Sequence, residues 1–256
     1  MNKVSAVIIC TNEEDNIEEC IKSISWADEI VILDGGSKDK TIEIAKKYTD
    51  KIFVNEWKGF AVQRNYSLSK VNYDWVFSLD ADERCPMELE SEIKEILIKD
   101  TISYKGFKIP RKSFFLNKWI KHCGWYPDYQ FRLFRKEYTK VTNRLVHEGF
   151  KVEGDIGILK NDILHYTVKT ISDFAARINK YSTLSAKEKV NKKSVTYLDL
   201  IIRPPLSFTR EYIIKKGFLD GIHGIMVALF NSITNMLTYM KTWELQNIKK
   251  SHVGKN

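Results

Sequence analysis

The chain has 256 residues, which is enough for one large α/β domain with a helical appendage and a sizeable buried core. Its composition, 43% hydrophobic and 29% charged, is that of an ordinary folded protein and argues against a disordered one. The net charge of +8 is uneven, because residues 1–165 carry 26 Lys+Arg against 27 Asp+Glu and residues 166–256 carry 15 against 6. This asymmetry predicts a basic C-terminal third that faces an anionic partner, either phospholipid headgroups or nucleic acid.

Strands and helices alternate with short links through the first 80 residues. Short apolar, β-branched runs predict the strands, and apolar residues at helical spacing predict the helices between them. Such an alternation predicts a Rossmann-like α/β domain whose mostly parallel sheet is flanked by helices on both faces. The expected elements, in chain order, are strand Val4–Cys10, helix Glu14–Ile24, strand Glu29–Leu33, helix Lys40–Tyr48, strand Lys51–Val54, helix Phe60–Lys70 and strand Trp75–Leu79.

The pattern changes in the second half of the chain. After a helix at Glu88–Ile98, three strands are predicted, at Lys105–Ile109, Tyr129–Phe134 and Ile156–His165. From Ile171 onward the chain is predicted to be helical, with Arg203-Pro204-Pro205 as a break between two helical groups. We therefore expect a catalytic domain over residues 1–168 and a basic, amphipathic helical tail over residues 169–256.

The four cysteines lie far apart and form no CxxC pair, which argues against a zinc knuckle and against a disulfide scaffold. A reducing compartment suits them best. The apolar run Val4–Cys10 leads into acidic residues without a cleavage-site pattern, so we interpret it as a first strand and expect no export signal.

Polar segments follow three of the predicted strands. They are Thr11-Asn12-Glu13, Asp34-Gly35-Gly36-Ser37 and Asp80-Ala81-Asp82-Glu83. Ligands of parallel α/β sheets bind beyond the carboxyl ends of the strands, so these segments are expected to meet in one crevice. Two aspartates two residues apart suit a hard divalent cation such as Mg²⁺ or Mn²⁺, although an isolated Asp-x-Asp is more often a solvated turn.

The order and spacing of these segments resemble family 2 glycosyltransferases of the GT-A fold. The resemblance rests on the three segments above together with Gln63-Arg64-Asn65. It extends to the lipopolysaccharide core-biosynthesis branch, similar to its β-glucosyltransferases, through Gly124-Trp125-Tyr126-Pro127-Asp128, Arg132-Leu133-Phe134-Arg135 and Val146-His147-Glu148. It implies an inverting, metal-dependent transfer of a hexose, by resemblance glucose, from a UDP-sugar donor.

The resemblance also implies roles for single residues. Gly35 and Lys38 depart from the family's usual second segment, but a tight turn after Asp34 is expected to suffice. Thr11, Glu13 and Asp34 would border the uracil and ribose, Arg64 would approach the base or diphosphate, Asp80 would contact ribose or a metal-bound water, and Asp82 and His165 would bind the metal.

An inverting transfer needs a base that deprotonates the acceptor hydroxyl. Glu148 is the preferred candidate and Asp128 the second. Taken alone, each carboxylate is as readily a surface or structural residue. Arg132 and Arg135 face either a phosphorylated acceptor or solvent, and the sequence favours neither.

The tail offers a surface for membrane contact. Gly221–Met240 is about as long as a bilayer span but contains too many polar residues for a spanning helix. A helix lying in the headgroup region is the preferred interpretation, and a helix packed on the catalytic domain, or one used in a homo-oligomer, is the alternative. The expected acceptor is then a lipid-linked or lipopolysaccharide glycan at the inner, cytoplasmic face of the cell membrane.

Two other functions are compatible with parts of the pattern. A sugar nucleotidyltransferase should carry a glycine-rich loop after its first strand, where this chain has Thr11-Asn12-Glu13-Glu14. A non-enzymatic membrane or nucleic-acid binding module would use the basic tail, but the tail contains no recognised nucleic-acid module, and no nucleic-acid partner is expected.

Overall fold

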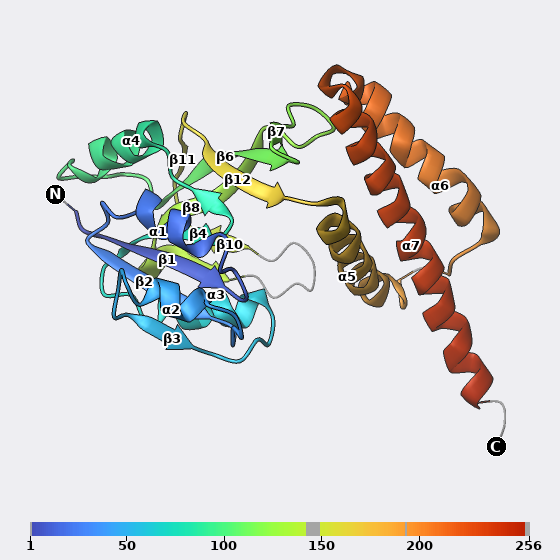
Figure 1. Cartoon of the computed structure of the whole chain (residues 1–256), viewed down its shortest axis with the longest axis horizontal. Helices are drawn as coiled ribbons and strands as arrows, with labels where there is room; N and C mark the ends of the chain where they lie inside the picture. The colour runs from blue at the N-terminus through green and yellow to red at the C-terminus, as the bar shows by residue number, and fades with distance from the viewer. Residues whose placement is uncertain (1, 142–148, 193, 254–256) are drawn as a thin grey trace. The chain divides into compact units, whose positions relative to one another are not determined.

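The computed structural model describes residues 2–141, 149–192 and 194–253 (Figure 1). The chain divides into two compact units. Unit 1 consists of Met1–Lys112 and Pro127–Tyr166, and unit 2 of Ser113–Tyr126 and Thr167–Asn256. The chain passes from unit 1 to unit 2 for the last time between Tyr166 and Thr167, and the sequence analysis placed its domain boundary at 168/169. Residues 113–126, which the sequence analysis placed in the catalytic domain, belong to unit 2.

The first half of unit 1 is a parallel sheet in the order β3-β2-β1-β4. Every residue of the central strand β1 is buried, as expected of a strand covered on both faces. The strands are β1 (Val4–Cys10), β2 (Glu29–Asp34), β3 (Ile52–Val54) and β4 (Trp75–Asp80).

Helices cover both faces of this sheet. Helices α1 (Ile17–Ser23), α2 (Thr41–Ala45) and α4 (Met87–Leu97) contribute to one core. The other core contains residues from α3 (Phe60–Leu68) and from the hairpin β9 (Thr139–Val141) and β10 (Phe150–Val152). The predicted alternation of strands and helices is therefore confirmed, with α1 and α2 shorter than expected.

The second half of the sheet is not parallel. Strand β8 (Asp128–Arg135) runs antiparallel to β4, and β6 (Gly106–Phe115) runs antiparallel to β8. The path continues through β12 (Ile163–Val168) to β5 (Glu83–Arg84). The single strand predicted at Ile156–His165 is wrong, because β11 (Ile156–Ile158) and β12 are separate strands joined by a turn. The short β7 (Lys118–Trp119) and the 3₁₀ helix η1 (Lys136–Tyr138) complete the set.

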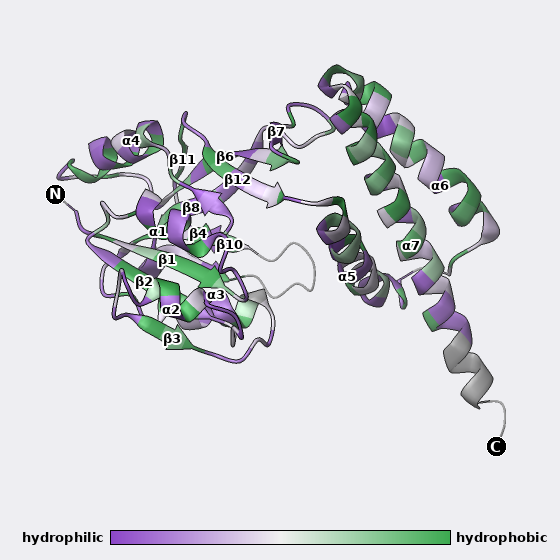
Figure 2. Ribbon diagram, in the orientation of Figure 1, coloured by the Kyte–Doolittle hydropathy of each residue, from purple (hydrophilic) through white to green (hydrophobic). Residues whose placement is uncertain are grey.

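Unit 2 is helical and has its own core. Its main elements are α5 (Ile171–Lys189), α6 (Tyr197–Thr209) and α7 (Ile222–Val253), and α7 packs against both other helices. Phe174 and Ile178 of α5 and Val227 of α7 are buried together. Figure 2 shows the hydrophobic residues of α6 and α7 in green. None of the described helices combines the length and apolar content that a membrane span requires.

The break predicted at Arg203-Pro204-Pro205 is wrong, because both prolines lie inside α6. Each removes one backbone donor, but Pro204 is buried and its carbonyl accepts a hydrogen bond from Ser232 Oγ of α7 at 2.8 Å. Packing against α7 thus sustains the helix. The irregularity appears further on, in the π-helical turn η2 (Arg210–Ile214), which precedes the 3₁₀ turn η3 (Gly217–Asp220).

Candidate active site

The loops that follow β1 and β2 are tied together at the carboxyl edge of the sheet. Asn12 N donates to Ser37 Oγ at 2.7 Å, and Lys38 N donates to Asn12 Oδ1 at 2.8 Å. Gly35 lies so close to the β1 loop that a Cβ there would be 2.1 Å from Thr11 Oγ1, and Gly36 has a φ of +94°. Gly35 therefore leaves room for Thr11, and Gly36 adopts a backbone conformation that other residues rarely adopt.

Asp34 organises this turn from within. Its Oδ2 accepts hydrogen bonds from the backbone N–H groups of Gly36 and Ser37, both at 2.7 Å, and its side chain is buried. Thr11 and Glu13 lie beside it on the β1 loop. Glu13 Oε2 accepts a hydrogen bond from Asn16 at 2.7 Å, and Glu13 N donates to Thr41 Oγ1 at 2.8 Å. The predicted nucleotide-binding residues of β1 and β2 thus share one rigid corner.

Asp80 stands at the end of β4, next to this corner, since the register pairs it with Ile9 and pairs Asp34 with Cys10. Arg132 Nη2, from β8, donates to Asp80 Oδ2 and to Glu83 Oε1, the latter at 2.7 Å. Both Glu83 and Arg132 are almost fully buried. Burial would raise the pKa of Asp80, but the guanidinium groups of Arg132, Arg64 and Arg111 outweigh it and hold that pKa below its usual range. Asp80 is therefore ionised at neutral pH, at the end of the strand.

Arg132 is in turn a permanent cation. Burial acts to lower the pKa of its guanidinium, but the carboxylates of Asp80 and Glu83 raise it above its usual value. Arg135, three residues further along β8, binds Asp74 Oδ2 at 2.5 Å and Glu137 Oε1 at 3.0 Å. The two arginines, which the sequence analysis treated alike, therefore have different partners: Arg132 binds carboxylates of the site, and Arg135 forms half-buried ion pairs outside it.

Asp128, the second candidate base, is held by an arginine. Its Oδ2 accepts from Arg111 Nε at 3.0 Å and Nη2 at 2.6 Å, and its Oδ1 accepts from Gln130 at 2.7 Å. Arg111 also approaches Glu83 Oε1 at 3.3 Å. Asp128 is therefore connected to Asp80 through Arg111, Glu83 and Arg132. To accept a proton it would have to weaken two charge-assisted hydrogen bonds.

Asp82 and His165, the two residues expected to bind the metal, lie next to each other. His165 Nε2 lies 3.2 Å from Asp82 Oδ2, and the backbone pairing of β12 with β5 places His165 opposite Glu83. A carboxylate oxygen and an imidazole nitrogen make a partial donor set, which leaves positions for diphosphate oxygens and water around a divalent cation. Among the described residues no group of three or more His, Cys, Asp or Glu side chains could hold a metal without such further ligands.

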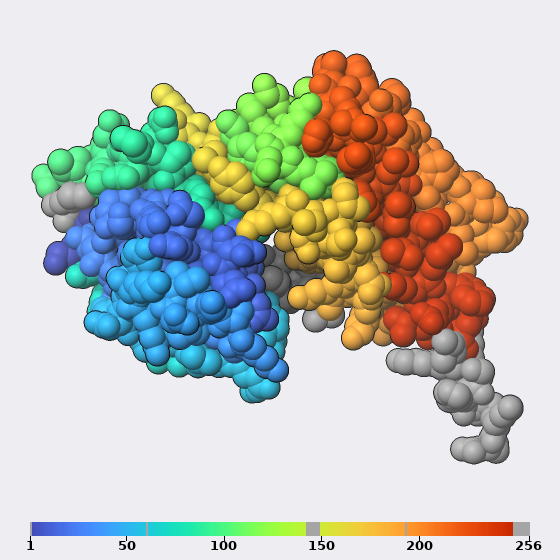
Figure 3. Space-filling view, viewed as in Figure 1, coloured from blue at the N-terminus to red at the C-terminus, as the bar shows by residue number. Residues whose placement is uncertain are grey.

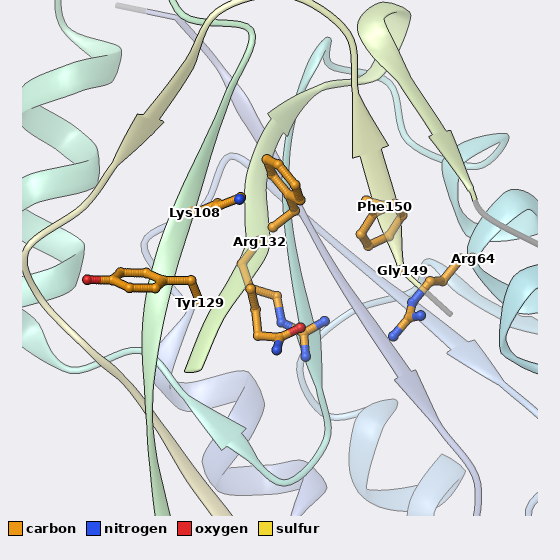
Figure 4. A pocket seen from close by; sticks show the side chains of 8 residues that line it. Arg64, Lys108, Tyr129, Arg132, Gly149 and Phe150 are labelled. Carbon is orange, nitrogen blue, oxygen red and sulfur yellow. The ribbon is translucent and has the colours of Figure 1, made fainter. Parts of the chain in front are cut away.

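A cavity of about 190 Å³ opens beside this edge, and it is cationic (Figure 4). Arg64 reaches it from α3, with Nη2 4.0 Å from Asp80 Oδ1, and Arg132 reaches it from β8. Lys108 of β6 lies over the ring of Phe131 at 5.1 Å and forms no ion pair with a described carboxylate. The remaining lining includes the aromatic side chains Tyr129, Phe131 and Phe150. The cavity therefore suits an anionic group flanked by a flat, apolar surface.

Sequence reasoning found the residues at the strand ends and missed those that connect them. Glu148, the preferred base, lies outside the described residues. Arg111, Lys108 and the structural role of Glu83 were not predicted. The strand predicted at Lys105–Ile109 was ended too early, because β6 continues past Pro110 to Phe115. A longer predicted strand would have included Arg111.

Comparison with known proteins identifies a family and several relatives. Residues 5–149 match the model of glycosyl transferase family 2. The chain is 29% identical to the lipopolysaccharide core biosynthesis glycosyltransferase LpsC of Rhizobium meliloti, covering 96% of this chain and 94% of that one. It is 28% identical to an uncharacterized glycosyltransferase of Rickettsia typhi, covering 96% and 88%. The crystal structure of Staphylococcus aureus TarS 1–349 in complex with UDP-GlcNAc superposes with a TM-score of 0.50 at 14% identity, over 97% and 92% of the chains.

The fold and the strand-end site define a glycosyltransferase of the GT-A fold. The chain belongs to glycosyltransferase family 2. Its similarity to LpsC, over nearly the whole of both chains, agrees with the lipopolysaccharide-core resemblance drawn from the sequence motifs.

Proposed function

We propose that this enzyme transfers a hexose, with glucose as the first candidate, from a UDP-sugar to a lipopolysaccharide-core or other cell-envelope glycan, with inversion of configuration. The similarity to LpsC supports the acceptor class, and the UDP-GlcNAc complex of TarS supports a UDP-sugar donor. The observation that carries the proposal is the pair of aspartates that follows β4. Asp80, the last residue of β4, accepts a hydrogen bond from Arg132, and Asp82, two residues later, lies next to His165.

The donor would lie over the corner formed by the loops after β1 and β2. Thr11, Glu13 and the Asp34 turn would border the nucleoside, and Arg64 and Asp80 would position the ribose and diphosphate. Asp82 and His165 would hold Mg²⁺ or Mn²⁺. The bound cation would neutralise the charge that develops on the departing diphosphate.

Glu148 is our proposed base, because Asp128 is engaged by Arg111. Asp128 would instead position Arg111 and, through Glu83, the Arg132 clamp. This division predicts that Asp128→Asn lowers kcat by less than Glu148→Gln does, and that Glu148→Gln leaves UDP affinity unchanged.

The cationic cavity is lined mainly by residues of β6 and β8, which lie on the side of β4 away from β1 and β2, and Arg64 of α3 closes it toward the donor corner. We therefore assign it to an anionic group of the acceptor, a phosphate or a carboxylate on the acceptor sugar. Lys108→Ala should raise the acceptor KM about tenfold, as loss of one charge-assisted contact would, with the UDP dissociation constant unchanged. Lys105→Ala on the same segment is the control.

The deciding experiment is a thermal-shift titration of the full chain with UDP, with and without Mn²⁺. Saturation at a hundred times the dissociation constant should stabilise the protein by about 2.7 kcal/mol. Asp82→Asn should abolish the metal-dependent part, and Asp155→Asn, an exposed carboxylate of unit 1, should not. Absence of any UDP-dependent shift, or release of pyrophosphate instead of UDP from the donor, would contradict the proposal.

A further inference from the structure

In one stretch of unit 2, residues 197–222, polar residues are buried and large apolar residues are exposed, the reverse of the usual arrangement. We call it the docking segment; it comprises α6, η2, η3 and the first residue of α7. Every residue in it is described, and the buried ones are polar, small or proline: Asp199, Pro204, Ser207, Glu211, Gly217 and Asp220. Its ten exposed large hydrophobic residues are Tyr197, Leu198, Ile201, Ile202, Leu206, Ile213, Ile214, Phe218, Leu219 and Ile222.

The neighbouring helix α5 has the ordinary arrangement. Its buried residues include Phe174, Ile178 and Ala186, and they contribute to the packing of unit 2. In the docking segment, by contrast, Ile201 is 66% exposed and Ile214 is 70% exposed. Figure 3 shows the atoms of α6, in orange, on the surface beside those of α7. An exposed apolar surface of this extent marks a site of association.

The charged residues of the segment are also divided between interior and surface. Its three carboxylates are all buried and bound: Asp199 by Arg203, Glu211 by Arg210 and Lys215, and Asp220 by His122. The exposed charges are all cationic, since the side chains of Arg210 and Lys215 are 59% and 40% exposed and Lys216 is exposed as well. The surface is therefore apolar and positive, with no exposed carboxylate.

We propose that the docking segment inserts into the surface of an anionic phospholipid bilayer. Isoleucine, leucine and phenylalanine side chains would enter the acyl boundary, while Arg210, Lys215 and Lys216 would contact lipid phosphates. This places the membrane contact on α6 and the following turns. It differs from the contact predicted at Gly221–Met240, where Val227, Ala228 and Thr238 are buried in unit 2.

A second copy of the chain fits this surface less well. A two-fold interface pairs a patch with itself, so the exposed cations would face one another without an exposed carboxylate between them. Lysine is also depleted from protein interfaces. Anionic lipid removes both objections, because it supplies negative charge and an apolar layer together.

The proposal deepens the proposed function by naming the surface that would bring the enzyme to a lipid-linked acceptor. Its test is vesicle flotation of the full chain, without donor or acceptor, on phosphatidylcholine vesicles with and without phosphatidylglycerol. We expect binding that requires phosphatidylglycerol and weakens as NaCl is raised. The double variant Ile201→Asp with Ile214→Asp should reduce the bound fraction about tenfold or more, because both side chains leave the acyl boundary.

The matched control is Met87→Asp with Ile98→Asp, two comparably exposed apolar residues of unit 1. It should bind vesicles as the wild type does. The UDP thermal shift should be the same in both double variants, which separates failure of docking from failure of the donor site. Equal vesicle binding by the Ile201/Ile214 variant, or no binding by the wild type at low salt, would overturn the proposal. A wild-type dimer that this variant dissociates, without vesicle binding, would instead identify a self-association surface.

Discussion

Both units of this protein bury charged side chains, but they distribute them differently. In unit 1, Asp80, Glu83 and Arg132 are joined in one network at the carboxyl edge of the sheet, which Arg111 extends to Asp128. In unit 2, Asp199, Glu211 and Asp220 share no common cation, and each is bound by its own neighbours. A shared network creates one strongly polarised place where a charged substrate can bind, whereas separate carboxylates tie down turns and leave the surface to apolar and cationic groups.

The largest effect is expected from replacing Arg132, which joins Asp80 and Glu83 in the network of unit 1. Arg132→Met removes the main cation of Glu83, which is buried, and of Asp80, which is half-buried, so the free energy of unfolding should fall by about 3–5 kcal/mol. Urea unfolding measures it. Arg135→Met, which breaks a solvent-accessible, half-buried ion pair on the same strand, should cost about 1 kcal/mol. Equal losses in the two variants would show that the network is not a unit.

The corresponding change in unit 2 should be smaller and should not affect nucleotide binding. Asp220 accepts hydrogen bonds from His122 N at 2.8 Å and lies 3.1 Å from His122 Nδ1. Asp220→Ala should lower the free energy of unfolding by about 2 kcal/mol, because a buried acceptor is lost. The UDP-induced thermal shift should persist. Its loss would mean that the donor site depends on this carboxylate.

Unit 1 also contains a buried carboxylate outside the network, which tests whether position or burial matters. Glu29 begins β2, at the opposite end of the sheet, and accepts hydrogen bonds from Asn72 N at 2.9 Å and Asn72 Nδ2 at 2.8 Å. Burial would raise the pKa of Glu29, but the bonds from Asn72, Lys51 and Ser5 outweigh it and lower that pKa.

Because the folded-state pKa is lowered, Glu29 stabilises the protein above the pKa of an unfolded glutamate. This stability is lost as the pH falls through the folded-state value. Glu29→Gln should cost roughly 1–2 kcal/mol at neutral pH and weaken the acid dependence of unfolding. Glu95→Gln, on the exposed side of α4, is the control, and an identical acid profile for both variants would contradict the assignment.

The smallest expected effect is a difference between the two units in how early their cysteines become accessible to labelling during urea unfolding. All four cysteines are buried as free thiols, with Cys10, Cys20 and Cys85 in unit 1 and Cys123 in unit 2. Burial raises the pKa of Cys85 to about 12 and that of Cys123 to about 11, so the native thiols should resist iodoacetamide. In increasing urea, Cys123 should be labelled first, because the core of unit 2 is smaller. Simultaneous labelling, read by mass spectrometry, would show one cooperative unit.

Much of unit 1 could be predicted from local patterns. Val4–Cys10 agrees with β1 at both ends, and the strands ending near Asp34 and Asp80 agree to within a residue. These successes have one cause: buried parallel strands are continuous apolar runs, and the polar residues that follow them share one edge.

Other features could not be predicted because they depend on which distant segments become neighbours. Arg132 binds Asp80 only because β8 pairs with β4, and Arg111 binds Asp128 only because β6 pairs with β8. The prolines of α6 are compatible with a helix because α7 packs beside them.

The primary structure was sufficient for the family, the parallel half of the sheet and the polar strand ends, all of which follow from short-range periodicity and spacing. Tertiary structure decided which carboxylates are neutralised by arginine, and it decided that α6 turns its apolar side outward. Periodicity reveals that a helix has two faces, but only the packing of its neighbours determines which of them is buried.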